Sequence, residues 1–175
     1  MSDLATALQH AIRDVPDFPK PGILFKDITP LLSDPELFDQ VCGALMEPWG
    51  EVDAVVGMES RGFLFGAPMA RAAGVPFVPA RKAGKLPYST VEVTYDLEYG
   101  TACLQMHTDA LKSGQRVLIV DDLLATGGTA AATVSLVRQL GAEVVGCAFV
   151  IDLSFLPGRS KLEAMGVSVE ALLAY

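Results

Sequence analysis

Apolar and polar residues follow each other along the chain in two kinds of block. Short continuous apolar runs, such as Val117–Val120, are separated by segments in which apolar residues recur with the spacing of a helix. A continuous apolar run is typical of a strand that is buried on both faces, as in a parallel sheet. The alternation therefore predicts an α/β fold, with a parallel, doubly wound sheet and helices on both of its faces.

The bounds of the predicted elements can be read from the same pattern. Strands are expected at 52–57, 76–80, 101–106, 116–121, 143–151 and 167–173, and helices at 2–15, 62–73, 128–140 and about 158–165. The capping-box pattern Ser33-Asp34-Pro35-Glu36 predicts a further helix that runs to about Met46. The proline-rich segment 16–30 is expected to be irregular, with a short extended piece at Ile23–Phe25. Val91–Tyr95 and Thr101–Met106 flank a short polar stretch and predict a hairpin. No repeat or linker is visible, so 1–175 is expected to be a single domain.

The most informative segment is 117–129, VLIVDDLLATGGT, in which a strand-like run meets two adjacent carboxylates, Asp121 and Asp122. In open α/β sheets, ligands bind outside the carboxyl ends of the strands. Paired carboxylates there can accept hydrogen bonds from sugar hydroxyls, or they can act through a divalent cation.

A turn of small residues and a predicted helix follow these carboxylates. Free backbone N–H groups and the helix dipole favour an anion at a helix N-terminus. Glycine lets the backbone wrap closely around phosphate oxygens, and threonine adds hydroxyl donors. The turn consists of Ala125, Thr126, Gly127, Gly128 and Thr129. Together with the carboxylates, it predicts a site for a phosphorylated sugar.

Other interpretations of this segment are weaker. No lysine follows the glycines, as the ATPase-type loop GxxxxGK[ST] requires, and the dinucleotide fingerprint GxGxxG is absent. The plain structural alternative is a strand that ends at Asp121 and Asp122, with Thr126 or Thr129 capping the next helix.

Composition narrows the class of protein. The chain is 51% hydrophobic and 19% charged, which is typical of a folded domain, and its net charge of −8 argues against a nucleic-acid or anionic-membrane surface. Two histidines without ligand spacing argue against a histidine-based metal cluster, and three dispersed cysteines indicate reduced thiols in a cytoplasmic protein. No signal or membrane-spanning segment is expected.

Three further segments carry candidate chemistry. Glu59-Ser60-Arg61-Gly62 lies between a strand and a helix, where it offers a second anion site with a guanidinium. Arg81, Lys82 and Lys85 form a local cationic group, which is either a solvated charge run or part of a lid. Phe25 is either an ordinary core residue or a stacking surface for a planar base.

These segments together resemble those of a known family. Segment 117–129 resembles the signature by which type I phosphoribosyltransferases bind phosphoribosyl diphosphate (PRPP). RKAGKLP at 81–87 and YDLEYG at 95–100 resemble the flexible lid of the adenine phosphoribosyltransferases, and FPKPGILFKDITP at 18–30 resembles their base-binding hood. The resemblance implies a mostly parallel twisted sheet flanked by helices, with a hood at about 16–33 and a lid at about 81–100.

The resemblance also implies roles for individual residues. Glu98 would carry a proton at the purine, and Tyr99 would position the lid. Arg61 would act in catalysis, in a turn that holds the diphosphate and contains a non-proline cis peptide between Glu59 and Arg61. Further substrate contacts would come from Leu24, Phe25, Lys26, Glu59, Ser60, Gly62, Arg81, Lys82, Lys85, Asp121, Asp122 and Ala125–Thr129.

The expected function is purine salvage, in which adenine and PRPP give AMP and diphosphate. The resemblance implies Mg²⁺ held mainly by the substrate, and a homodimer in which lid cations such as Arg81 serve the neighbouring subunit. Two alternatives stay open: a regulatory protein of the same fold that binds nucleotide, and a transferase for hypoxanthine, guanine, xanthine or orotate. The charge of −8 and the complete lid motif with Glu98 count against the regulatory protein.

Overall fold

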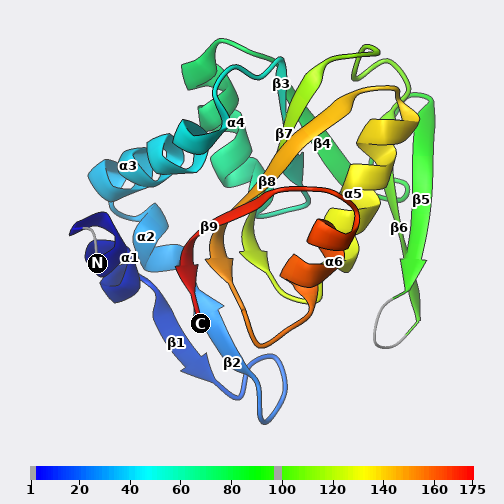
Figure 1. Cartoon of the computed structure of the whole chain (residues 1–175). Helices are drawn as coiled ribbons and strands as arrows, with labels where there is room; N and C mark the ends of the chain where they lie inside the picture. Colours follow the sequence, from blue (N-terminus) through cyan, green and yellow to red (C-terminus); the bar gives the residue numbers. More distant parts are fainter. Residues whose placement is uncertain (1–2, 97–99) are drawn as a thin grey trace. The chain divides into compact units, whose positions relative to one another are not determined.

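The computed structural model describes residues 3–96 and 100–175 (Figure 1). The chain forms two compact units, Met1–Ala44 and Leu45–Tyr175. In the described part of the larger unit, the strands form one seven-stranded sheet in the order β5-β6-β4-β3-β7-β8-β9. The strands are β3 (Ala54–Met58), β4 (Phe77–Lys82), β5 (Thr90–Asp96), β6 (Thr101–His107), β7 (Arg116–Leu124), β8 (Glu143–Asp152) and β9 (Val169–Ala174).

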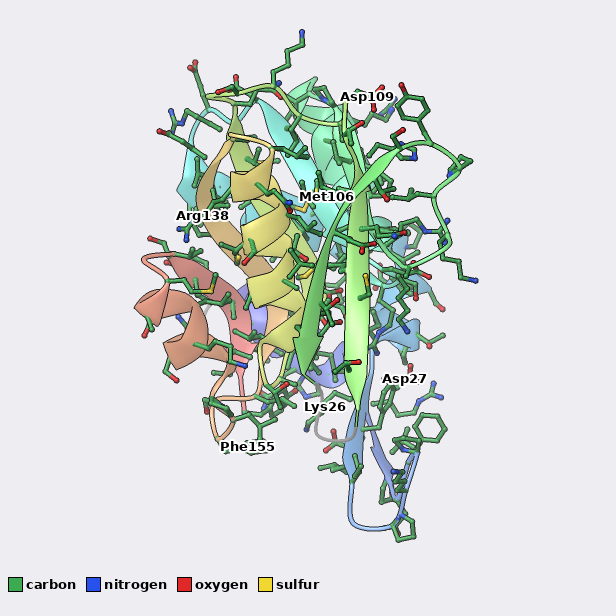
Figure 2. All side chains as sticks on the ribbon, turned by 90° about the vertical axis from the view of Figure 1, so that its right-hand side faces the viewer. Lys26, Asp27, Met106, Asp109, Arg138 and Phe155 are labelled. Atoms are coloured by element: carbon green, nitrogen blue, oxygen red, sulfur yellow. The ribbon has the colours of Figure 1, made fainter. Side chains whose placement is uncertain are left out.

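The sheet is mostly parallel, as the apolar runs predict. Strands β4, β3, β7, β8 and β9 pair in parallel, whereas β5 and β6 form an antiparallel hairpin at one edge. The hairpin predicted from the alternating stretches Val91–Tyr95 and Thr101–Met106 is therefore confirmed. Figure 2 shows it beside α5.

Helices cover both faces of this sheet (Figure 1). Helix α4 (Gly62–Ala73) packs on β3 and β7, and α5 (Gly128–Gln139) packs on β5, β6, β7 and β8. Helix α6 (Gly158–Ala164) packs beside α5 and β9, and a short 3-10 helix, η1, spans Glu47–Trp49. The side chains of Val117 and Ile119 join the apolar cluster under α5, because alternate residues of a strand point to the same face. The doubly wound arrangement is therefore confirmed.

Strand β7 is longer than the sequence pattern predicts. It continues past position 121 to Leu124, because its ladder with β8 extends through Leu123–Ile151 and Leu124–Asp152. Asp121 and Asp122 thus lie within the strand and do not follow it. The partner strand satisfies the backbone groups at this point, so two polar side chains do not end the strand.

The smaller unit corrects the expected first helix. It contains α1 (Asp3–Ala11), β1 (Arg13–Pro16), β2 (Leu24–Asp27), α2 (Thr29–Leu32) and the first turns of α3 (Pro35–Met46). The expected helix at 2–15 is wrong at its end, since Arg13–Pro16 pairs with β2 in an antiparallel ladder. This pairing joins residues on a second strand across a loop, such as Val15 with Phe25, and helical periodicity does not report it.

None of the helices in the described ranges combines the length and the apolar composition that crossing a bilayer requires.

Candidate active site

The end of β7 and the start of α5 form a loop that can surround an anion. Gly127 is the N-cap of α5 and has a left-handed backbone, with φ of 75°. Its carbonyl accepts the N–H of Ala131 at 2.9 Å, which starts the helix. The first N–H groups of a helix have no partner within it, so the first turn of α5 presents donors at the loop. The predicted phosphate cradle therefore has the expected strand, turn and helix.

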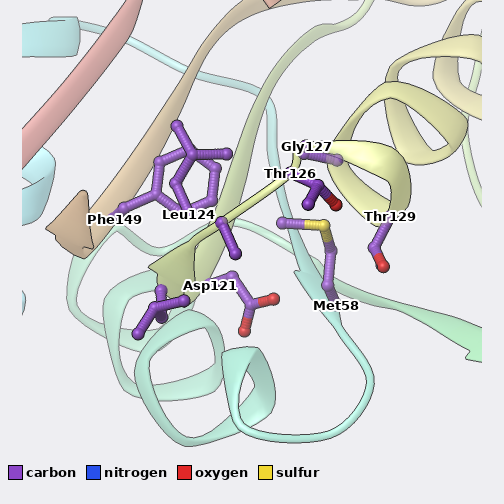
Figure 3. A pocket seen from close by; sticks show the side chains of 10 residues that line it. Met58, Asp121, Leu124, Thr126, Gly127, Thr129 and Phe149 are labelled. Atoms are coloured by element: carbon purple, nitrogen blue, oxygen red, sulfur yellow. The ribbon is translucent and has the colours of Figure 1, made fainter. Parts of the chain in front are cut away.

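A cavity of about 110 Å³ opens at this loop (Figure 3). On a scale where one water molecule needs about 10–15 Å³, the cavity is several water molecules in size. Five residues of the predicted site line it: Asp121, Ala125, Thr126, Gly127 and Thr129. Asp122 and Gly128, which were expected at the same place, are not among the lining residues. The sequence interpretation missed the apolar walls, which are Met58, Leu123, Leu124, Ala130 and Phe149.

Asp121 and Asp122 are coupled electrostatically. The N–H of Asp122 donates to Oδ1 of Asp121 at 2.9 Å. Burial, and next the charge of Asp122, raise the pKa of Asp121 well above its usual value. Burial also raises the pKa of Asp122, against the opposing effect of the Arg61 guanidinium. Asp122 is buried and Asp121 is half-buried beside the cavity. Two neighbouring carboxylates in such a place disfavour their charged forms, and a cation or a hydroxyl donor would relieve this cost.

Arg61 and Asp122 form an ion pair. Nε of Arg61 lies 3.0 Å from Oδ2 of Asp122, whose side chain is 3% exposed. Oδ2 of Asp122 is buried and has no hydrogen-bond partner among the described residues. The contact with Arg61 is therefore an ion pair without hydrogen-bond geometry. Arg61 therefore balances the charge of Asp122 as an ion. A guanidinium that is 39% exposed in its side chain also has room to meet an anion from solvent.

The turn that carries Arg61 lies at the same sheet edge as the phosphate loop. Strands β3 and β7 are parallel neighbours, with Val56 opposite Ile119, so their carboxyl ends meet. A side chain at Gly62 would collide with the carbonyl oxygen of Val120, at 2.6 Å. The expected non-proline cis peptide is present between Glu59 and Ser60.

Glu59 holds the cationic group at the end of β4. Nε of Arg81 donates to Oε2 of Glu59 at 3.2 Å, and the N–H of Lys82 donates to the same oxygen at 2.9 Å. Burial alone would raise the pKa of Glu59, but these two donors outweigh it and lower the pKa. Nη1 of Arg81 also donates to the carbonyl of Lys85 at 3.2 Å, while the side chains of Lys82 and Lys85 are exposed.

The lid hairpin contacts the phosphate loop directly. The hydroxyl of Tyr95 on β5 lies 3.0 Å from the hydroxyl of Thr129. The sequence interpretation missed this contact, although Tyr95 belongs to the lid motif. Glu98 and Tyr99 lie outside the described residues, so their expected roles stay predictions.

The hood belongs to the smaller unit and has a cavity of its own. Val15, Phe18, Phe25 and Asp27 line a cavity of about 260 Å³. The rings of Phe18 and Phe25 meet edge to face, with their centroids 5.1 Å apart. Phe25 is thus partly exposed beside an apolar hollow, which suits a planar ligand better than a closed core would.

The backbone of β2 offers hydrogen-bonding groups next to Phe25. Leu24 and Lys26 direct their backbone groups to the same side, because this direction alternates along an antiparallel strand. The side chain of Leu24 is exposed. The side chain of Lys26 is buried, where its Nζ donates to Asp14 at 2.6 Å. Its charge is therefore engaged within the unit, and only the backbone of Lys26 is suited to the expected reading of a base.

Metal-ligand clusters are not found in the described ranges: no group of three or more His, Cys, Asp or Glu side chains there could hold a metal ion. The carboxylates of Asp121 and Asp122 are nevertheless hard oxygen donors, which Mg²⁺ prefers together with phosphate oxygens and water. The site fits a cation that is held jointly with a substrate and does not fit a resident metal centre.

Comparisons with known proteins agree with this site. Residues 40–161 match the family of the phosphoribosyl transferase domain, and this range includes the phosphate loop, the Arg61 turn and the lid. The fold and the site thus define a phosphoribosyl transferase. Adenine phosphoribosyltransferase from Methylococcus capsulatus is 59% identical over 170 residues, which cover 96% of this chain and 98% of the relative.

Two solved structures are similar over nearly the whole chain. Adenine phosphoribosyltransferase from Rhodothermus marinus has a TM-score of 0.93 at 53% identity, covering 98% of each chain. The enzyme from Saccharomyces cerevisiae, complexed with an imino-altritol bisphosphate and adenine, has a TM-score of 0.92 at 45% identity, covering 99% of this chain and 100% of the other. This chain belongs to the adenine phosphoribosyltransferase family.

Proposed function

We propose that this enzyme transfers the 5-phosphoribosyl group of PRPP to adenine and yields AMP and diphosphate, as a step of purine salvage. The observation that carries the proposal is the cavity in which Asp121 faces the turn Ala125–Gly127 and the first residues of α5. The turn amides and Thr126 and Thr129 suit the 5-phosphate, and the carboxylates suit the ribose hydroxyls.

The diphosphate of PRPP requires a second anion site. The turn Glu59–Gly62 and the cations Arg81, Lys82 and Lys85 are proposed to provide it. Their position supports this, because β3, β4 and β7 are parallel neighbours whose carboxyl ends share one edge of the sheet. In a chain with a net charge of −8, local cations are needed to hold a polyanion.

Mg²⁺ is proposed as the cofactor, held mainly through oxygen atoms of PRPP. It would supply positive charge to the departing diphosphate. In the chain itself, Asp121 and Asp122 are proposed as its carboxylate donors, since burial raises the pKa of both. A cation beside them would stabilise their charged forms.

Adenine is proposed to bind at the hood, where Phe25 stacks on the base and the backbone of Leu24 and Lys26 reads its edge. The cavity beside Phe25 and the partial exposure of that ring support this assignment. The yeast relative, which is 45% identical, was crystallised with adenine. Backbone donors and acceptors can distinguish bases by hydrogen bonding without any polar side chain.

The reaction then follows from these groups. The bond between the anomeric carbon and the diphosphate oxygen breaks, and Arg61 and the lid cations stabilise the charge that develops on the leaving group. A ring nitrogen of adenine forms the new bond to the anomeric carbon and loses its proton to Glu98. The role of Glu98 rests on the LEYG motif, in which Tyr99 is proposed to position the lid.

We further propose that 1–175 acts as a single catalytic domain in a cytoplasmic homodimer. Its partners would be the small-molecule substrates and a second copy of the chain, with no nucleic acid or membrane. The family supports the dimer, and the charge of −8 supports the absence of a nucleic-acid surface.

The test is a diphosphate-release assay with PRPP, Mg²⁺ and a panel of bases: adenine, hypoxanthine, guanine, xanthine and orotate. Adenine is expected to support turnover with the highest kcat/KM by at least about a hundredfold, because unpaired polar groups in a site penalise the wrong base. Release with another base at an equal rate would contradict the adenine assignment. Tight binding of PRPP without release with any base would indicate a regulatory protein.

A further inference from the structure

Helix α6 contacts the phosphate loop through backbone atoms, with no side chain between them. A side chain added at Gly158, the first residue of α6, would collide with the carbonyl oxygen of Ala125. One added at Gly127 would come within 2.9 Å of the Cα of Gly158. Gly158 is buried, and its backbone does not have the positive φ that would itself require glycine. The close approach of α6 to the loop is therefore the reason for glycine at this position.

Arg159, the next residue, connects α6 to the end of β8 and the start of β9. Its Nε donates to Oδ2 of Asp152 at 2.7 Å, and its Nη1 donates to the carbonyl of Val169 at 2.7 Å. Asp152 is the last residue of β8, and it stands opposite Leu124, the last residue of β7. The guanidinium thus joins β8 and β9 to the helix that supports the loop. Figure 1 shows α6 against the lower end of α5.

Asp152 depends on this contact. It is 1% exposed, and its Oδ1 has no hydrogen-bond partner within the described residues. A buried carboxylate that loses its cation becomes an uncompensated charge, and the surrounding structure moves to reach water or another donor. The residues that would move are the ends of β7 and β8 and the first turn of α6, which are the supports of the loop.

A phosphate cradle built from backbone amides needs such support. Amide donors stabilise an anion well only when they are held within about 0.5 Å of the productive geometry. Thr126 and Gly127 line the cavity, whereas Asp152, Gly158 and Arg159 do not. These three residues lie outside the cavity lining, so their effect on a bound phosphate would act through the backbone of the loop.

We propose that Arg159 and Asp152 are positioning residues for the 5-phosphate subsite, acting through the contact of Gly158 with Ala125. The proposal rests on the proposed function, since it takes the loop 125–129 to hold the 5-phosphate of PRPP. It assigns a role to the C-terminal segment 152–159, outside the segments that bind substrate.

The test compares Arg159→Met, Arg159→Lys and Gly158→Ala with the wild-type enzyme. The matched control is Glu163→Gln, since the exposed Glu163 is the weaker partner of Arg159, at 3.9 Å. Four quantities are measured: Tm, the Kd for ribose 5-phosphate by calorimetry, and the KM values for PRPP and adenine. The wild-type Kd tests the proposed function separately: if ribose 5-phosphate does not bind at all, the loop assignment fails first.

Arg159→Met and Gly158→Ala are expected to raise the Kd for ribose 5-phosphate and the KM for PRPP by about tenfold, which corresponds to about 1.4 kcal/mol. The KM for adenine should change less than about twofold, because it does not depend on these amides. Arg159→Lys should restore part of the affinity, and Glu163→Gln should behave as wild type. If wild type binds ribose 5-phosphate and the variants bind it equally well, the positioning role is overturned, whatever happens to Tm. Equal increases in both KM values would overturn it too.

Discussion

The hydroxyl of Tyr95 on the lid strand β5 lies 3.0 Å from the hydroxyl of Thr129 in the first turn of α5. Thr129 also lines the cavity at the phosphate loop, so one side chain contacts the lid and faces the proposed 5-phosphate site. A hydroxyl can donate one hydrogen bond and accept two, which lets Thr129 serve both partners. The lid and the loop are therefore coupled by a direct contact.

Removing this contact should show measurable coupling between the two residues. Tyr95→Phe and Thr129→Val are each expected to lower the free energy of unfolding, and a double-mutant cycle should give a coupling energy of about 0.5–1.5 kcal/mol. Urea unfolding of the four proteins measures it. The control is Tyr88→Phe, because Tyr88 is 60% exposed. A coupling energy of zero would mean that the two hydroxyls do not interact in solution.

Asp122→Asn should weaken the handling of PRPP. Asparagine keeps the size of the side chain but removes the charge that is paired with Arg61 at 3.0 Å. The carboxylate is also proposed to accept a hydrogen bond from a ribose hydroxyl, and hydrogen bonds to charged groups contribute about 1.5–3 kcal/mol, so the KM for PRPP is expected to rise by about tenfold or more. Asp109→Asn, at an exposed carboxylate, is the control. A normal KM for PRPP together with normal turnover would remove Asp122 from substrate binding.

Asp121→Asn should stabilise the free enzyme at neutral pH. Burial, and next the charge of Asp122, raise the pKa of Asp121, so the folded state binds its proton more tightly than the unfolded chain does. The free energy of unfolding is therefore highest below the ordinary Asp pKa of about 4, and Asp121 lowers it as the pH rises through the raised pKa. Asparagine can still accept the N–H of Asp122 and does not titrate.

The measurement is Tm from pH 4 to pH 8 for both proteins. The variant should have the higher Tm at pH 8, and the difference should shrink toward pH 4. A gain of 1 kcal/mol corresponds to about 2–4 °C in a domain of this size. Binding of PRPP should be weaker in the variant, since the carboxylate is proposed to meet a sugar hydroxyl. A lower Tm for the variant at pH 8 would show that the charge of Asp121 does not destabilise the folded enzyme.

Phe25→Ala should affect adenine more than PRPP. Stacking of a base on an aromatic ring contributes about 1–3 kcal/mol, so the KM for adenine should rise by about tenfold or more while the KM for PRPP stays within about twofold. Phe155→Ala is the matched control, because Phe155 is 73% exposed and belongs to the larger unit (Figure 2). Equal effects of the two substitutions on adenine would contradict stacking at Phe25.

Glu98→Gln should lower kcat by about a hundredfold or more if this residue accepts the proton of adenine. Glu92→Gln in strand β5 is the control, since Glu92 is an exposed lid carboxylate that accepts a hydrogen bond from Gln105. Single-turnover kinetics would show whether the chemical step itself is slowed. An unchanged kcat would exclude Glu98 as the base.

Local patterns were sufficient for most of the fold. The bounds of α4 agree with the predicted 62–73, and α3 begins within the predicted capping box and ends at the predicted Met46. In both cases the helical spacing of apolar residues lies within the segment itself, so no distant partner is needed to predict the helix. The sequence pattern failed at Arg13–Pro16 and at the end of β7, because a strand there depends on a partner strand that is distant in the chain.

Segment 117–129 alone encoded the residue types of the phosphate loop and the order of strand, turn and helix. It could do so because backbone amides and small residues define such a cradle locally. Tertiary structure decided which other residues meet it. Tyr95 reaches Thr129 across 34 positions, and Gly158 touches the carbonyl of Ala125 only because β8 returns the chain to the same edge of the sheet. Contacts between distant segments follow from packing, which no local periodicity contains.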